Sequence, residues 1–146
     1  FGDELTPRIC RNIEKYAIRF REEDPKKHSW QRLYMYAMVN RLLSETTESM
    51  ELIDNGKYYP CISVQQLLSA NKHVETVTLK EGTYAIFTHK GNIPGISKLF
   101  EAIVNYWIPK SKYQIAENTF PYIKFLNNPM MVDEKDLLAE IYVPVI

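Results

Sequence analysis

The second half of the chain is organised around one stretch of sequence, Glu81-Gly82-Thr83-Tyr84-Ala85-Ile86-Phe87-Thr88-His89-Lys90-Gly91. Tyr84 to His89 is a β-prone run that follows a Glu-Gly turn signal, so it predicts a strand. The preceding run, Val74 to Leu79, is also β-prone, and we expect the two runs to form a strand pair. Loop-forming residues come directly afterwards, at Gly91, Pro94 and Gly95.

An amphipathic helix is expected after this loop. Its apolar side chains recur at the spacing of one helical face, at Ile96, Leu99, Phe100, Ile103 and Trp107. Pro109 is expected to end the helix, because proline cannot donate the next hydrogen bond. Two final strands are predicted at Tyr122 to Leu126 and Leu138 to Val145, joined by the turn-rich Asn127-Asn128-Pro129.

The first half shows a similar order of elements. Between Lys15 and Arg21, apolar and charged residues alternate, which predicts a half-buried strand. Ser29 is placed to cap a helix. The apolar positions of this helix share one face: Trp30, Leu33, Tyr34, Ala37, Met38 and Leu42.

A hairpin is predicted after this helix. Its strands are Met50 to Asp54 and Tyr58 to Val64, with Asn55-Gly56 between them, a dipeptide typical of type I′ turns. Lys57 fits either the turn or the second strand. Pro60 lacks an N–H group, so it predicts an edge position without a partner on that strand.

Strand, helix, strand, strand therefore occurs twice. This order predicts an α+β fold, a tandem βαββ repeat with pseudo-twofold symmetry, an antiparallel sheet, two main helices and a central ligand cleft. A length of 146 residues and a hydrophobic content of 45% fit one domain. We expect residues 1–12 to be a linker or lead-in and residues 13–146 to form the domain.

The composition excludes some classes of partner and leaves others open. Lys plus Arg and Asp plus Glu both total 18, so no basic surplus favours binding to a nucleic-acid backbone. No apolar run approaches the roughly 20 residues that span a bilayer, so no membrane contact is expected. Cys10 and Cys61 belong to no CxxC pair, and we interpret them as free thiols in a cytoplasmic protein.

Three ordered motifs resemble the GyrI-like family. They are the residue 81–91 stretch, the helix end Tyr106-Trp107-Ile108-Pro109-Lys110-Ser111-Lys112-Tyr113, and the closing Ile141-Tyr142-Val143-Pro144-Val145. The match is strong over Thr76 to Ile146, whereas the first half agrees in element order. The resemblance implies the tandem βαββ fold, found in stand-alone gyrase-inhibitor-like proteins and in the effector-binding domains of AraC-type and MerR-type transcription regulators.

One position departs from the family pattern. Family members that capture lipophilic cations usually carry a buried Glu in the strand where this chain has Ile123. An ionised acid in an apolar pocket contributes charge pairing that Ile cannot replace, so we predict a neutral or weakly polar apolar ligand. The same substitution, with the absence of nucleophile or phosphate-loop motifs, argues against an enzyme. Glu140 could act as an acid or base, but its alternation with apolar neighbours predicts that it faces solvent.

The predicted ligand site is mainly aromatic, because aromatic walls with polar tips suit drug-like molecules. Ordinary core packing is the alternative interpretation for each of these residues. The histidines lack the spacing of a metal site, and no cofactor is expected. The predicted ligand-binding residues are Trp30, Tyr34, Tyr59, Phe87, His89, Trp107, Tyr113, Ile123 and Phe125.

Two functions are compatible with this sequence. The first is a ligand-sensing effector-binding domain of a bacterial transcription regulator, which would contact DNA only through a domain upstream of Phe1 and could form a homodimer. The second is a stand-alone protein that sequesters a small molecule or inhibits a partner enzyme.

Overall fold

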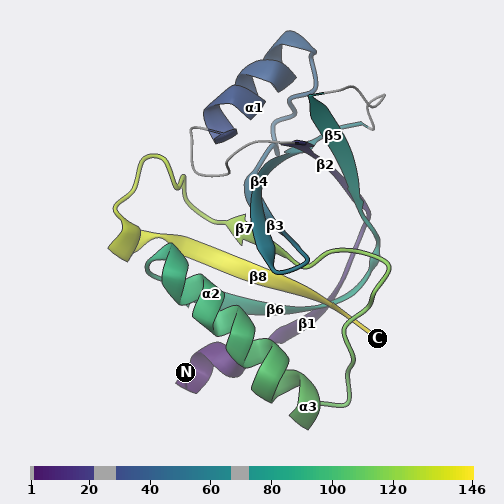
Figure 1. Cartoon of the computed structure of the whole chain (residues 1–146), viewed down its shortest axis with the longest axis vertical. Helices are drawn as coiled ribbons and strands as arrows, with labels where there is room; N and C mark the ends of the chain where they lie inside the picture. Colours follow the sequence, from purple (N-terminus) through teal and green to yellow (C-terminus); the bar gives the residue numbers. More distant parts are fainter. Residues whose placement is uncertain (1, 22–28, 67–72) are drawn as a thin grey trace.

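One eight-stranded antiparallel sheet forms the body of the domain (Figure 1). The computed structural model describes residues 2–21, 29–66 and 73–146. The sheet order is β1-β6-β8-β7-β3-β4-β2-β5. The strands are β1 (Arg8–Asn12), β2 (Lys15–Phe20), β3 (Ser49–Asp54), β4 (Lys57–Val64), β5 (Val74–Leu79), β6 (Gly82–Lys90), β7 (Tyr122–Phe125) and β8 (Leu138–Val145).

Two main helices pack on the sheet, one on each half. The first is α1 (Ser29–Val39), and the second is α2 (Ile93–Ala102), which continues through the π-helix η2 (Ile103–Trp107) into α3 (Ile108–Lys110). Short 3-10 turns occur at η1 (Gly2–Leu5) and η3 (Glu134–Asp136). In Figure 1, α1 lies beside β4 and β2, whereas α2 lies beside β8 and β6. None of the described helices is long and apolar enough to cross a membrane.

The sheet confirms the tandem βαββ repeat. One half contributes the order β3-β4-β2-β5 and the other the order β7-β8-β6-β1, and the halves join where β3 pairs with β7. The edge strands are exchanged between the halves, because β1 precedes β2 but pairs with β6, and β5 precedes β6 but pairs with β2. Each half therefore depends on the other for one edge strand.

The predicted pairing of β5 with β6 is wrong. Both strands form, but β5 lies at one edge of the sheet and β6 lies next to the opposite edge. A two-residue hairpin needs positive φ at its central residues. Among the described non-glycine residues only Arg41 and Asn55 have positive φ, so Lys80-Glu81 forms no such turn and the chain crosses to the other half.

Residues 8–12, predicted to lie in a linker, form β1 instead. They pair with β6 from Arg8 opposite Ile86 to Asn12 opposite Gly82. Their side chains are half-buried or exposed, without the alternation that marks a buried face. This strand is held mainly by its backbone ladder, which leaves no period in the sequence.

The second helix ends at Lys110, one residue after the predicted end at Pro109. Within η2 the helix is wider than an α-helix, because its hydrogen bonds span five residues. The N–H of Ile108, for example, donates to the carbonyl of Ile103. Pro109 then lies in the first turn of the short α3, where its missing N–H is tolerated. The helix stops at Ser111, whose N–H lies 3.0 Å from the carbonyl oxygen of Trp107.

The predicted hairpin is confirmed, and its register is now defined. Asn55 and Gly56 have φ of 51° and 78°, as a type I′ turn requires. Asp54 pairs with Lys57, so Lys57 belongs to the strand. The pairing of β4 with β2 covers Ile62 to Val64 and does not reach Pro60. Pro60 therefore has no partner on that side.

The first helix buries most of its predicted face. Leu33 and Ala37 are buried against β2 and β4, whereas Met38 is 62% exposed. Leu42 also reaches this core, although it follows the helix, because the turn at Arg41 brings the chain back. The predicted cap at Ser29 involves a side chain outside the described part of the structure.

The sheet has a core on each face. The helix face carries two clusters, one under α2 that includes Ile123, and one under α1 that includes Leu33. The opposite face carries a third cluster, which contains Tyr84, Tyr122 and Tyr142. Tyr122 and Tyr142 stack with ring centroids 4.6 Å apart. Strands of both halves are therefore buried on two sides.

Candidate functional site

The seam between the two halves carries a buried carboxylate. Glu51 of β3 lies directly opposite Ile123 of β7, and these two strands join the halves. β3 and β7 are the equivalent strands of the two repeats. The resemblance predicts a carboxylate at position 123, and this chain instead carries one opposite that position, at Glu51.

Alternation along β3 turns Glu51 inward. Met50 and Leu52 belong to the core on the far side of the sheet, so Glu51 and Ile53 face the helices. Glu51 is only 7% exposed, and its Oε2 atom has no hydrogen-bond partner among the residues that the structure describes. Burial raises the pKa of Glu51 to about 7, because an apolar surrounding disfavours the ionised form.

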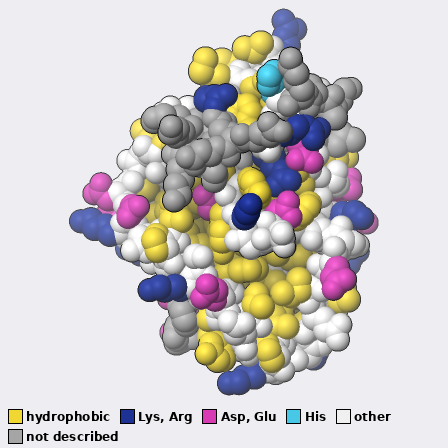
Figure 2. Space-filling view, viewed as in Figure 1, with side chains coloured by type: hydrophobic (Ala, Val, Ile, Leu, Met, Phe, Trp, Pro, Cys, Tyr) yellow, Lys and Arg dark blue, Asp and Glu magenta, His cyan; other side chains and the backbone are white. Residues whose placement is uncertain are grey.

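A cavity of about 230 Å³ lies between the hairpin of the first half and the helix of the second. Glu51 does not line it, but Ile53, the next residue on the same face of β3, does. The hairpin contributes Ile53, Gly56 and Tyr58, and the helix contributes Ser97, Phe100, Glu101, Val104 and Asn105. Figure 2, drawn in the same view as Figure 1, shows hydrophobic side chains gathered in the middle of the molecule. The cavity therefore has apolar walls with a few polar groups, as small-molecule sites usually do.

Tyr58 connects the cavity to Glu51. Tyr58 pairs with Ile53 across the hairpin, and Ile53 is the next residue after Glu51 on the same face of β3. Burial raises the pKa of Tyr58, a hydrogen bond with Ser97 lowers it, and the charges of Glu51 and Glu101 raise it further. The phenol thus lies within electrostatic reach of two carboxylates, one buried in the seam and one exposed beside the cavity.

Four of the nine predicted site residues lie around the seam on the α1 side. Trp30 meets Phe125 edge to face at 5.6 Å, and its indole N–H donates to the carbonyl of Met50 at 3.2 Å. Tyr34 belongs to the same helix, α1, and its hydroxyl oxygen lies 3.2 Å from the hydroxyl oxygen of Ser49. Ile123 is fully buried in the neighbouring core. These contacts place an aromatic wall beside the seam.

The other predicted residues lie elsewhere. Phe87 meets the Trp107 ring at 5.2 Å, and Trp107 stacks on Tyr113 at 6.0 Å, which forms a separate group under η2. His89 is buried near the start of α2, with its Nδ1 atom 2.7 Å from Glu4 Oε2. Tyr59 packs with the core on the opposite face, beneath the guanidinium group of Arg19. The nine residues therefore form no single cleft, and their role in ligand binding stays a prediction.

The sequence prediction missed Glu51 and the cavity residues of the hairpin and helix. A weak signal was present, because Glu51 is the one charged residue in the run Met50-Glu51-Leu52-Ile53. Strands buried on both faces read as continuous apolar runs, so a carboxylate inside one is unusual. The burial of both faces of β3 could not be read from the sequence, because it depends on the pairing of the two halves.

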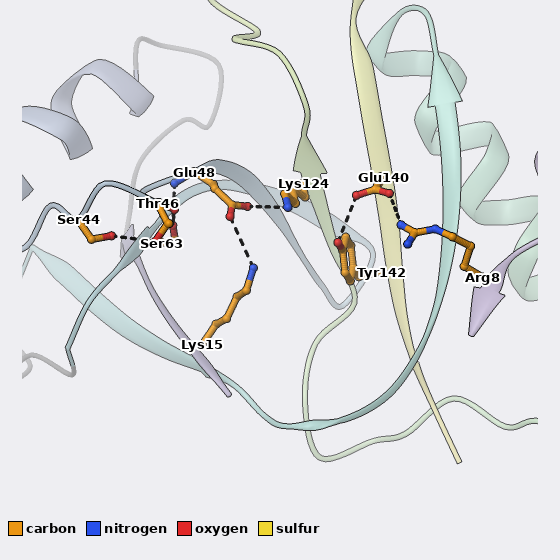
Figure 3. Close-up of polar contacts among 9 residues, drawn as sticks. All are labelled: Arg8, Lys15, Ser44, Thr46, Glu48, Ser63, Lys124, Glu140 and Tyr142. Atoms are coloured by element: carbon orange, nitrogen blue, oxygen red, sulfur yellow. Dashed lines mark hydrogen bonds and ion pairs between the residues drawn. The ribbon is translucent and has the colours of Figure 1, made fainter. Parts of the chain in front are cut away.

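A row of charged residues crosses the opposite face of the sheet (Figure 3). Glu48 lies between Lys15, at 3.8 Å, and Lys124, at 3.5 Å. Glu140 pairs with Arg8 and accepts a hydrogen bond from Tyr142 at 3.2 Å. The row links strands of both halves and lies away from the cavity.

The prediction that Glu140 faces solvent is therefore wrong. Its side chain is 12% exposed, because the curved sheet has a second core on this face. The pKa of Tyr142 rises to about 12, first through burial and then through the charge of Glu140. Within the described residues, no group of three or more His, Cys, Asp or Glu side chains could hold a metal ion.

These features define a class of protein: a two-repeat α+β domain whose halves meet at a seam with a small cavity beside it. The sequence matches the family model of the GyrI-like small molecule binding domain over residues 19–146. The chain therefore belongs to the GyrI-like family, and the resemblance found in the motifs is confirmed. The matched region extends beyond those motifs into the first half. No curated protein matches the sequence.

Solved structures share this fold at low sequence identity. The EcmrR C-terminal domain has a TM-score of 0.72 and 15% identity, with 97% of each chain covered. EcmrR in a complex with DNA gives the same TM-score and identity, and there this chain spans only 57% of the EcmrR chain. A hydrolase from Listeria innocua has a TM-score of 0.61 and 12% identity, covering 96% of this chain and 91% of its own.

SAV2435 bound to tetraphenylphosphonium has a TM-score of 0.56 and 13% identity, covering 96% of this chain and 93% of its own. At these identities the similarity establishes the fold alone.

Proposed function

We propose that this domain is an effector-binding receptor that holds a small, largely apolar or aromatic molecule beside the seam. The ligand lies in the cavity between the β3–β4 hairpin and α2, and it presents a positive charge or a hydrogen-bond donor toward Glu51. The observation that carries this proposal is the buried carboxylate of Glu51, whose Oε2 atom has no partner within residues 2–21, 29–66 and 73–146. Buried polar groups without partners are costly and are concentrated at functional sites.

This proposal revises the ligand class predicted from the sequence. A neutral ligand was expected because Ile123 replaces the carboxylate that lipophilic cations pair with. Glu51 stands opposite Ile123 and supplies a carboxylate from the other repeat. In a low-dielectric surrounding, pairing of this group with a cation is far stronger than in water. The tetraphenylphosphonium bound to SAV2435, a protein of the same fold, supports a cation as the first probe.

We place this receptor in a bacterial transcription regulator, as in the EcmrR–DNA complex. DNA contact would then come from a domain upstream of Phe1, and the two subunits of a homodimer would each carry one site. A stand-alone protein that sequesters its ligand or inhibits a partner enzyme is the alternative. The intact reading frame separates the two, because the regulator requires a helix-turn-helix segment before Phe1.

The test of the site compares two molecules of nearly equal shape, phenyltrimethylammonium and tert-butylbenzene, which differ in charge. Ligand-detected NMR at pH 8 measures the affinity of each for the wild-type protein. We expect the cation to bind at least about tenfold more tightly than the hydrocarbon, since about 1.4 kcal/mol of charge pairing suffices for that ratio. In Glu51→Gln this preference should disappear.

Glu140→Gln is the matched control, because it removes a mostly buried carboxylate on the opposite face. It should leave the preference for the cation unchanged. Equal affinities for the two molecules in the wild-type protein, or a preference that survives in Glu51→Gln, would rule out Glu51 as the group that recognises the ligand.

A further inference from the structure

Among the described residues, no cation forms an ion pair with Glu51, and burial is the one cause of its raised pKa. Across the seam, β7 presents Ile123 and Phe125. On the hairpin, the titratable neighbours are Tyr58 and Cys61, whose pKa values burial raises. Glu101 lies across the cavity on α2. The first helix adds Trp30 and Tyr34, whose polar atoms bond to Met50 and Ser49.

An ionised Glu51 would therefore place an uncompensated negative charge between two packed halves. Tyr58 and Cys61 can only add negative charge, and the charge of Glu101 has the same sign. Lys15 and Lys124 pair with Glu48 on the opposite face of the sheet. Arg19, whose charge acts on Cys61, pairs with Asp54 and Glu75. With the charges of the described residues, Glu51 is neutralised by protonation, since isolated buried groups neutralise rather than remain charged.

We propose that a cationic ligand enters this site in exchange for the proton of Glu51, so that ligand binding by this receptor is coupled to proton release. This inference rests on the proposed function of the cavity. The O–H bond of the Glu51 carboxyl group breaks, the proton passes to water or buffer, and the ligand cation takes its place without forming a covalent bond. The net charge of the seam is the same before and after binding.

The exchange makes affinity depend on pH in one direction. A cation pairs with the ionised form only, so the apparent dissociation constant is the intrinsic constant divided by the ionised fraction. With a pKa of about 7 for Glu51, that fraction falls about tenfold from pH 8 to pH 6. The receptor should thus hold its ligand more tightly as pH rises and release it on acidification.

Phenyltrimethylammonium tests this exchange, because its charge does not change with pH. Isothermal titration calorimetry at pH 6, in two buffers of different ionisation enthalpy, gives the number of protons released per bound cation. We expect close to one proton at pH 6, about a tenth of a proton at pH 8, and affinity about tenfold higher at pH 8. Tert-butylbenzene should bind with no proton release and no pH dependence in this range.

Variants assign the proton to its residue. Glu51→Gln should abolish proton release together with the pH dependence, whereas Glu140→Gln should retain both. The wild-type measurements in the two buffers stand by themselves if the glutamine variant fails to fold.

Three results would overturn the exchange. If the cation binds with a flat pH profile and no proton release, the exchange is wrong while the proposed binding site stands. If Glu51→Gln still releases a proton, another group carries it. If neither probe binds the wild-type protein at any pH, the proposed function fails and the exchange fails with it.

Discussion

Replacing Glu51 with Gln separates the charge of this side chain from its size. Glutamine has nearly the shape of a protonated glutamic acid and cannot ionise. Its effect on stability should therefore be small at acidic pH, where the native carboxyl is neutral, and should grow as pH rises. We expect Glu51→Gln to stabilise the protein at alkaline pH, although it removes a native side chain.

The size of this effect follows from the pKa of the buried acid. Burial raises the pKa of Glu51 from 4.5 to about 7, and each tenfold change in proton affinity corresponds to about 1.4 kcal/mol. The folded protein binds the proton more tightly than the unfolded chain does, so stability is fully present below pH 4.5 and is lost as pH rises to about 7. The loss at pH 8 is about 3 kcal/mol, and Glu51→Gln should recover most of it.

Urea denaturation of both proteins at pH 4.5 and pH 8 measures the difference in unfolding free energy. Other titrating groups contribute equally to both proteins, so they cancel in the comparison. We expect the glutamine variant to gain about 3 kcal/mol relative to wild type between the two pH values. An equal difference at both pH values, or a variant that is less stable at pH 8, would mean that a partner compensates the charge of Glu51 in the folded protein.

Other predictions concern the seam, the hairpin and the thiols. Ile123→Glu should raise affinity for phenyltrimethylammonium in NMR titrations but lower the urea midpoint, because it buries a second acid. Adding Glu51→Ile to this variant moves the single carboxylate across the seam, and it should restore stability and retain cation binding. Gly56→Ala should cost about 1 kcal/mol in urea denaturation, because its φ of 78° is strained for a residue with a Cβ. Ellman's reagent should titrate Cys10 in the folded protein and Cys61 only after unfolding, because Cys61 is fully buried and burial raises the pKa of its thiol; rapid reaction of two thiols per folded chain would contradict this.

The sequence alone was sufficient for the elements that have a side-chain period or a special turn. Alternation located β2, the spacing of apolar residues located both main helices, and Asn55-Gly56 located the hairpin turn. The order of these elements predicted the tandem repeat, and the family motifs agreed with it. Each of these signals is local, because it depends on residues within a few positions of each other.

The tertiary structure decided what depends on pairing between distant segments. The exchange of β1 and β5 between the halves is carried by backbone hydrogen bonds, which leave no pattern in side chains. The position of Glu51 was decided in the same way. Ile123 could be read as a missing acid from the sequence, but only the pairing of β3 with β7 places Glu51 opposite it, where it is buried.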